Sequence, residues 1–367
     1  MGLPSEQVLQ SGAATDEVVA HTLVSDLHTL KPSIFWTDML LSAAVGWTGF
    51  AVAVAQPSWS YWTVAGVLVA VFALYRGMCF THEIAHQPGR TLRGFETAWN
   101  ALFGVPLLLP SFTYVGVHQS HHSLSTYGTK DDPEYLPFAR SRGLIVLFAV
   151  QASFVLPVAL FVRFVFLSPF GLIAPPFHRW LETFASSFSM NPSYRRVVTS
   201  AAASRMRRSE VAMLAFWGLV LTGMYFGVVP KRVLLVWLAV MVAISFVNAL
   251  RVLGAHEYDS DGNPLDRRGQ LRDSIDTPGA AWTELWAPVG LRYHALHHYF
   301  PGIPYHNLGA AYRRIVQHVP GESAYYQSVS PSLRRSLIKL LARAKAGAVR
   351  LSSDAFRHHQ SAGFRSH

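Results

Sequence analysis

The sequence predicts an all-α polytopic membrane protein, because charged residues are few and apolar residues are gathered in long blocks. Of the 367 residues, 51% are hydrophobic and 14% are charged, whereas roughly 25% of a soluble domain is charged. A helix needs about 20 mostly apolar residues to cross a bilayer. Four blocks reach that length, and we expect them to be the transmembrane helices: 34–55, 59–80, 211–229 and 233–252.

The four predicted spans form two hairpins, because short turns at 57–58 and 230–232 separate the members of each pair. Two further apolar blocks, at 101–117 and 143–174, are interrupted by prolines, and the second also contains Arg163. A single crossing by either block would place the histidine clusters described below on opposite faces of the membrane. We therefore expect both blocks to be re-entrant or to lie along the interface.

Positive charge is concentrated outside the predicted spans. Residues 82–210 and 251–367 carry most of the 31 lysines and arginines, and the formal net charge is +10. The positive-inside rule places both segments in the cytoplasm, and we interpret the charge as contact with membrane lipid and expect no nucleic-acid partner. The arginine-rich composition suggests a bacterial inner membrane. The chain then divides into a polar N-terminal segment (1–33), a membrane domain (34–314) and a basic C-terminal tail (315–367).

Three histidine clusters follow the apolar blocks. They read H-E-I-A-H at 82–86, H-Q-S-H-H at 118–122 and H-A-L-H-H at 294–298. Spacings of three and four residues put the members of a cluster on one face of a helix, where they can converge on a metal ion. The first pattern is a weak signal by itself, but the rarer H-x-x-H-H pattern occurs twice.

A single further histidine, His256, follows the fourth predicted span at the same membrane face as the clusters. With it the converging imidazoles number nine, which is more than one ion can hold, and neutral imidazole is a ligand for iron, copper, zinc and nickel. The sequence therefore predicts two metal ions bound by His82, His86, His118, His121, His122, His256, His294, His297 and His298.

This arrangement resembles the membrane fatty acid desaturase family, which also contains hydroxylases, acetylenases and ketolases. The resemblance covers residues 36–314 and extends to Y-G-T-K-D-D-P-E at 127–134, D-S at 273–274 and the segment 286–301. It implies that the nine histidines bind two iron ions in a helical cap at the cytoplasmic face.

The resemblance also implies the chemistry, in which the two irons use O2 to attack an unreactive methylene. We predict desaturation of a fatty acyl chain carried by a lipid, by CoA or by a carrier protein, with hydroxylation, ketone formation and triple-bond formation as alternatives. The sequence has no dinucleotide-binding glycine motif and no cysteine set for an iron–sulfur cluster. Electrons must then come from a separate ferredoxin, cytochrome or reductase.

Carboxylates near the clusters could accept the second N–H of each imidazole and offset the charge of the irons. In the acyl-desaturase branch an asparagine one helical turn before the lone histidine contacts metal through water. Val252 occupies that position here, and the nearest asparagine lies a further turn away. The candidates for these outer contacts are Glu83, Asp131, Asp132, Glu134, Asn248, Glu257 and Asp273.

Two other classes of protein stay open from the sequence. The H-E-x-x-H pattern at 82–86 is a zinc protease signature in which Glu83 would be the general base. That reading leaves seven clustered histidines without a role. A transporter or metal sensor would use the histidines for binding alone, but no charged residue lies in the middle of a predicted span to mark an ion path.

Overall fold

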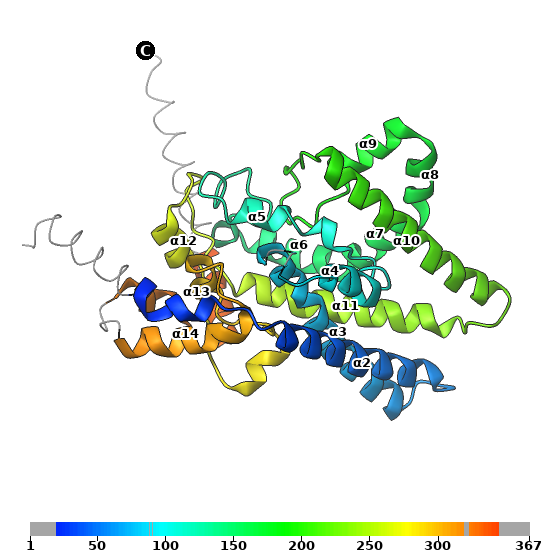
Figure 1. The fold of residues 1–367 in the computed structure, drawn as a ribbon, viewed down its shortest axis with the longest axis horizontal. Helices are drawn as coiled ribbons and strands as arrows, with labels where there is room; N and C mark the ends of the chain where they lie inside the picture. Colours follow the sequence, from blue (N-terminus) through cyan, green and yellow to red (C-terminus); the bar gives the residue numbers. More distant parts are fainter. Residues whose placement is uncertain (1–19, 88, 90, 319–322, 345–367) are drawn as a thin grey trace, which may run out of the picture.

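The computed structural model describes residues 20–87, 89, 91–318 and 323–344, so residues 1–19 and 345–367 of the two predicted end segments lie outside it. The described chain is all-α, with isolated β-bridges but no strand. The long helices between residues 32 and 86 pack beside the helix at 232–253, and the helices between residues 267 and 318 lie at one end of them (Figure 1). The α-helices are α2 (Pro32–Ala55), α3 (Tyr61–His86), α4 (Phe95–Trp99), α5 (Val117–His121), α6 (Arg142–Val150), α7 (Leu156–Phe161), α8 (Ser168–Ile173), α9 (Pro175–Phe184), α10 (Ser200–Tyr225), α11 (Arg232–Leu253), α12 (Arg267–Asp273), α13 (His294–Tyr299) and α14 (Tyr305–His318).

Among the described residues, four helices are long and apolar enough to cross a membrane. Three of them, α2, α3 and α11, coincide with predicted spans. The fourth is the continuous helix Arg142–Ile173, which comprises α6, α7, α8 and the π-helical turns between them. The predicted set of spans differs from this one, because it counted the block 211–229 in α10 and expected the block 143–174 to be re-entrant or interfacial. The first half of α10 carries three arginines and Glu210, which lowers its hydropathy.

The helix Arg142–Ile173 is continuous despite its two prolines because each follows a π-helical turn. Pro157 and Pro169 are the second residues of α7 and α8, directly after the π turns Gln151–Val155 and Val162–Leu167. A wider turn relieves the clash between a proline ring and the preceding carbonyl. The charge of Arg163 is neutralised within the protein, because its guanidinium lies 2.6 Å from Glu210 on α10. The sequence pattern alone could not show the π turns before the prolines or the Arg163–Glu210 ion pair.

After this long helix the chain returns to the segments that precede it, on both sides of the second histidine cluster. Helix α9 folds back against α8, and the loop behind it pairs with the segments on both sides of the second histidine cluster. The Phe188 amide donates to the Thr113 carbonyl, and the Met190 amide donates to the Pro133 carbonyl. The segments before and after residues 142–184 therefore lie on the same side of the helix bundle, as a common histidine site requires.

Helices α2 and α3 form a close hairpin because glycines face each other where they cross. A Cβ atom on Gly49 would lie 2.8 Å from the Gly66 carbonyl oxygen, and one on Gly66 would lie 2.7 Å from the Gly49 oxygen. Small residues of this kind allow close packing of membrane helices. The turn before α3 is fixed by a capping box between Ser60 and Thr63. The hairpin holds the C-terminal end of α3 at the end of the molecule that carries α12, α13 and α14.

A C-terminal helix at 333–344 covers this end of the molecule. Leu340 and Ala344 are buried in a cluster with Leu253 and Tyr258, which flank His256. The amphipathic tail thus packs its apolar side against protein, close to the end of α11.

Candidate metal centre

All nine predicted histidines gather at one end of the helices. His82 and His86 lie in the last turn of α3, which extends beyond the apolar part of that helix. The second cluster lies in and just after α5, and the third lies in α13. His256 lies three residues after the end of α11. Spacings of three and four residues place the members of each cluster on one helix face, so that the elements can converge.

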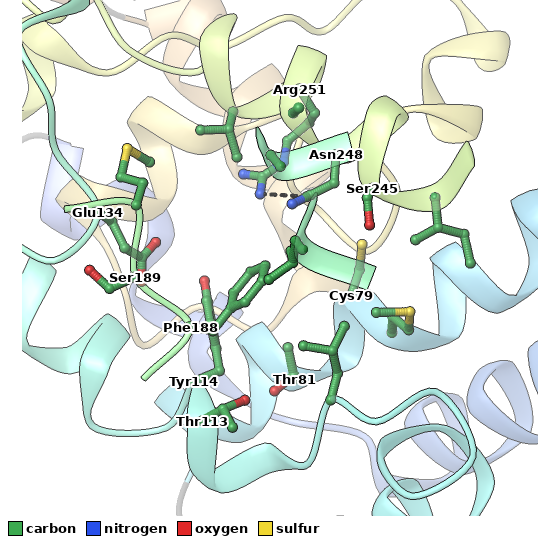
Figure 2. Close-up of a pocket in the computed structure, with 18 of the residues that line it drawn as sticks. Cys79, Thr81, Thr113, Tyr114, Glu134, Phe188, Ser189, Ser245, Asn248 and Arg251 are labelled. Carbon is green, nitrogen blue, oxygen red and sulfur yellow. Dashed lines mark hydrogen bonds between the residues drawn. The ribbon is translucent and has the colours of Figure 1, made fainter. Parts of the chain in front are cut away.

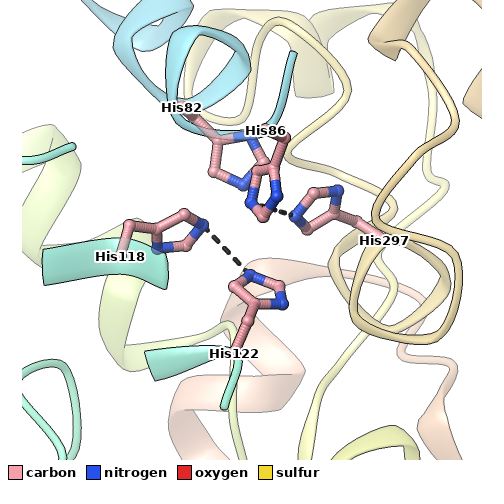
Figure 3. Close-up of side chains that lie close together, drawn as sticks. All are labelled: His82, His86, His118, His122 and His297. Atoms are coloured by element: carbon pink, nitrogen blue, oxygen red, sulfur yellow. Dashed lines mark hydrogen bonds between the residues drawn. The ribbon is translucent and has the colours of Figure 1, made fainter. Parts of the chain in front are cut away.

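The nine histidines form two separate groups. Within each group, one ring nitrogen from every member lies within 4.8 Å of the corresponding nitrogen of every other member. Each group contains histidines from more than one sequence cluster, so no single cluster supplies a complete set of metal ligands. The five-histidine group, drawn in Figure 3, consists of His82, His86, His118, His122 and His297, and the four-histidine group of His121, His256, His294 and His298.

The spacing of the ring nitrogens matches that of ligands around shared metal ions. The Nε2 atoms are 3.1 Å apart for both His118–His122 and His86–His297, and 2.9 Å apart for His256–His294. Two imidazoles bound at right angles to one ion, each at roughly 2.1 Å, have nitrogens about 3.0 Å apart. The two pairs in the five-histidine group and the pair in the four-histidine group therefore have the separation expected of neighbouring ligands.

Several of these nitrogens have no hydrogen-bond partner although they are buried. Both ring nitrogens of His82 and Nε2 of His121 are in this state. A buried polar atom without a partner costs free energy, and a metal ion in each group would satisfy it. The donor set therefore fits two ions that accept imidazole ligands.

Burial keeps most of the rings neutral. It lowers the pKa of His118, His256, His294 and His298, and neighbouring imidazoles lower the pKa of His118, His294 and His298 further. Neutral imidazole is the form that binds metal. His121 differs, because burial lowers its pKa but the carboxylate of Asp132 outweighs that effect and raises it.

Two carboxylates from the 127–134 segment orient histidines of the second cluster. Glu134 lies 2.9 Å from Nδ1 of His118, and both oxygens of Asp132 lie within 3.0 Å of Nδ1 of His121. Burial raises the pKa of Glu134 to about 7. These contacts leave Nε2 of each ring directed at its group, which is how outer carboxylates position metal-binding imidazoles.

The lone histidine has a different set of partners. The Tyr127 hydroxyl lies 2.9 Å from Nδ1 of His256 and donates to Asp273, which also accepts from Tyr135. The closest Asp273 oxygen is 3.4 Å from His256 Nδ1. Sequence reasoning singled out Asp273 but missed the two tyrosines, although both lie in or next to the 127–134 motif.

The remaining predicted outer residues have other contacts. Glu83 accepts from the Tyr305 amide and lies 3.6 Å from Nδ1 of its neighbour His82. Asn248 accepts from Arg251, and Glu257 forms ion pairs with basic residues of the C-terminal helix. Asp131 is exposed at the surface.

A cavity of about 370 Å³ opens beside the five-histidine group. His82, Glu134 and Tyr114 line it, and the Tyr114 ring stacks on His118 with the ring centroids 4.8 Å apart. Figure 2 shows Glu134 and Tyr114 pointing into this space from separate segments. Apolar side chains of the membrane helices form much of the remaining wall: Met78, Phe148, Ala152, Val155, Leu156, Ala159, Ile244, Ala249 and Val252.

The family described as fatty acid desaturase matches residues 57–330, a range that contains all nine histidines and both groups. The chain belongs to the fatty acid desaturase family. As in the wider desaturase and hydroxylase superfamily, it is an oxidoreductase of lipid metabolism. That superfamily is di-iron, and the two histidine groups of this chain have the arrangement of groups that could bind metal. The zinc-protease interpretation of the first cluster is thereby displaced, since His82 and His86 belong to a larger group.

This desaturase-family chain is also similar to a curated protein from Caulobacter vibrioides (strain NA1000 / CB15N) described as ceramide hydroxylase. The two are 37% identical over 327 residues, which is 89% of this chain and 93% of that protein. The similarity thus runs through the membrane helices and the histidine groups alike.

Proposed function

We propose that the chain is an O2-dependent di-iron hydroxylase that acts on a ceramide-class lipid in the membrane. The observation that carries this proposal is the similarity to the ceramide hydroxylase of Caulobacter vibrioides, because it extends over nearly the whole of both proteins. Desaturation of a fatty acyl chain, predicted from the sequence, is the second candidate, and the family description favours it. Both reactions would use the same histidines.

The proposed reaction inserts one oxygen atom of O2 into a C–H bond of a methylene group. The other oxygen atom leaves as water, and two electrons and two protons are consumed. Desaturation would instead remove two hydrogens and reduce both oxygen atoms to water. The irons would supply the oxidising power when bound by the five- and four-histidine groups. Their ligands in this proposal are the nine histidines brought together in the structure.

The protein would bind the lipid, aim one methylene at the histidines and exclude water. The cavity is suited to this task, since His82 lines it together with apolar residues of α3, α11 and the helix Arg142–Ile173. A lipid tail could thus lie between helices that are themselves apolar enough for the bilayer. Holding one carbon close to the metal site converts binding into a rate advantage.

We place the protein in a bacterial inner membrane with the histidine groups facing the cytoplasm. The end of the molecule that carries these groups also carries α12 and the C-terminal helix, both rich in arginine. Basic residues favour the cytoplasmic side, where a ferredoxin, cytochrome or reductase can deliver electrons. If the donor docks through acidic groups, turnover will fall as salt is raised from low ionic strength to about 0.15 M or above.

Lipid mass spectrometry of cells that express the chain tests the proposed reaction. We expect ceramides that have gained one oxygen atom, and no such product with His298→Ala as the matched inactive control. Ceramides or acyl chains that have lost two hydrogens, without an added oxygen, would replace hydroxylation by desaturation. A lipid profile identical to that of the control would contradict both.

A further inference from the structure

The cavity beside the five-histidine group has a polar corner formed by the last turns of α11. Arg251 donates through a terminal guanidinium nitrogen to Oδ1 of Asn248 at 2.9 Å. The Tyr75 hydroxyl donates to the Trp286 carbonyl and lies 3.4 Å from the same Asn248 oxygen. All three of Arg251, Asn248 and Tyr75 line the cavity, and Figure 2 shows the Arg251–Asn248 pair at one side of it.

Arg251 differs from two other arginines of the helix bundle, Arg163 and Arg76, in its partners. Arg163 pairs with Glu210, and Arg76 pairs with Asp38 and Glu284. Among the ion pairs of the described residues, Arg251 takes part in none. Its Nε atom is buried without any hydrogen-bond partner. A guanidinium carries five N–H donors, and leaving them unsatisfied in an apolar cavity is costly.

Two hydroxyl groups elsewhere in the cavity lining also lack hydrogen-bond partners. The Thr81 hydroxyl, directly before His82 in α3, is buried without a partner, and so is the Ser187 hydroxyl in the loop after α9. The cavity therefore combines apolar walls with unsatisfied donors at defined positions. Such a lining suits a molecule that is mostly hydrocarbon but carries an oxygen acceptor within its buried part.

We propose that Arg251, supported by Asn248, binds the amide carbonyl oxygen of an N-acyl lipid and so selects the carbon that is oxidised. The inference rests on the proposed function and adds the part of the lipid that is recognised. In a ceramide-class lipid the amide carbonyl is a strong acceptor at the start of the acyl chain. Since Arg251 and His82 line one cavity of about 370 Å³, the carbon presented to the histidines lies within a few bonds of that carbonyl.

The assignment makes Arg251 a residue for substrate positioning, which separates it from the metal ligands. Asn248 then serves to hold the guanidinium, because its side-chain oxygen accepts from Arg251. This role accounts for the asparagine of α11 without a contact to metal through water.

Binding measurements on the purified iron-loaded protein test the assignment. The two probes are a ceramide and an uncharged alkyl-ether analogue in which an ether oxygen replaces the amide N–H and a methylene replaces the carbonyl. In the native protein the carbonyl should improve Kd by roughly 10- to 100-fold, the range for a hydrogen bond to a charged group. Arg251→Met should reduce that ratio to about 2-fold or less, and Arg251→Lys should restore part of it.

The matched control is Arg232→Met at the other end of α11, where the arginine donates to Ser58 and Thr63 outside the cavity. It should keep the native ratio, and all variants should keep their iron. An unchanged ratio in Arg251→Met, or a native protein indifferent to the carbonyl, would overturn the assignment. Turnover is scored separately, so carbonyl-dependent binding without a hydroxylated product would refute the proposed function and leave the subsite standing.

Discussion

The two histidine groups have the same kind of ligand but different surroundings. In the five-histidine group His86 and His122 are partly exposed, and His82 lines the cavity of about 370 Å³. In the four-histidine group all members are buried, and none lines that cavity. The five-histidine group is therefore the one to which a substrate has access, and the four-histidine group is enclosed by protein.

Their outer contacts follow the same division. The enclosed group is supported by Asp132 at His121 and by the Tyr127–Asp273 pair at His256, all of them buried. The five-histidine group, called the open group from here on, receives one carboxylate contact of comparable length, from Glu134 to His118. A carboxylate held beside each ring raises the basicity of a metal ligand. We infer that the enclosed group binds its ion more tightly.

The largest expected effect comes from removing one ligand of each group. His82→Ala should empty mainly the open site and His256→Ala mainly the enclosed site, so that each variant keeps about one of two ions and loses more than about 100-fold of its turnover. Metal analysis and Mössbauer spectroscopy on purified protein measure both changes. Simultaneous loss of both ions in both variants would show that the groups do not act as separate sites.

A smaller effect is expected from substitutions that keep volume but remove one outer contact. Glu134→Gln should weaken iron binding in the open group by roughly 10-fold, and Tyr127→Phe should weaken it in the enclosed group by less than that. Because the enclosed group also keeps Asp132, Tyr127→Phe should be the milder of the two. Competition with a chelator gives both affinities, and the reverse order would break the inferred difference between the groups.

Substitution in the cavity should change the product with little effect on either ion. Arg251→Met should give a mixture of products hydroxylated at different carbons of the acyl chain. Without the contact to the amide carbonyl, no single methylene is held nearest the open group. Tandem mass spectrometry of the product locates the oxygen, and metal content serves as the control. A single, unchanged position in the variant would argue against selection by Arg251.

The smallest effect concerns Asp276, which supports the helix α13 that both groups share. Its carboxylate accepts from the Leu296 amide and from the Tyr325 hydroxyl, and burial raises the pKa of Asp276 to about 7. With a folded pKa above the unfolded value of 3.8, the folded state binds this proton more tightly. The free energy of unfolding should therefore fall as pH rises toward 7 and level off above it.

The Asp276→Asn variant has no such proton to lose. The stability difference between this variant and the native protein should widen in favour of the variant from about pH 5 to about pH 7, by at most about 1.4 kcal/mol per pH unit. Thermal unfolding of the metal-free proteins at matched pH measures that difference. A constant difference over this range would contradict the raised pKa.

Much of this arrangement was predictable because metal binding constrains the sequence strongly. Neutral ligands at helical spacing are rare by chance, so the clusters could be recognised, and the structure gathers all nine histidines as the count required. Three predicted spans coincide with helices long and apolar enough to cross a membrane, because each is a long apolar block with few charged residues. In these cases residues close together in the sequence determine the feature that was predicted.

What could not be predicted depends on contacts between distant residues. The division into five and four histidines splits the second and third clusters, so spacing within a cluster does not reveal it. The continuity of helix Arg142–Ile173 was not predicted, because it depends on the Arg163–Glu210 ion pair and on π turns before the two prolines. Tyr127 and Tyr135 carry no metal signal of their own, and their role emerges only where the chain folds beside Asp273.

We propose that the nine histidines hold two irons in unequal surroundings. Metal analysis of the purified protein, combined with Mössbauer spectroscopy, tests it most directly. We predict about two irons per chain and two spectral components, of which the one lost first to a chelator disappears selectively in His82→Ala. A single zinc ion per chain, or one iron component lost as a unit in both His82→Ala and His256→Ala, would contradict the account.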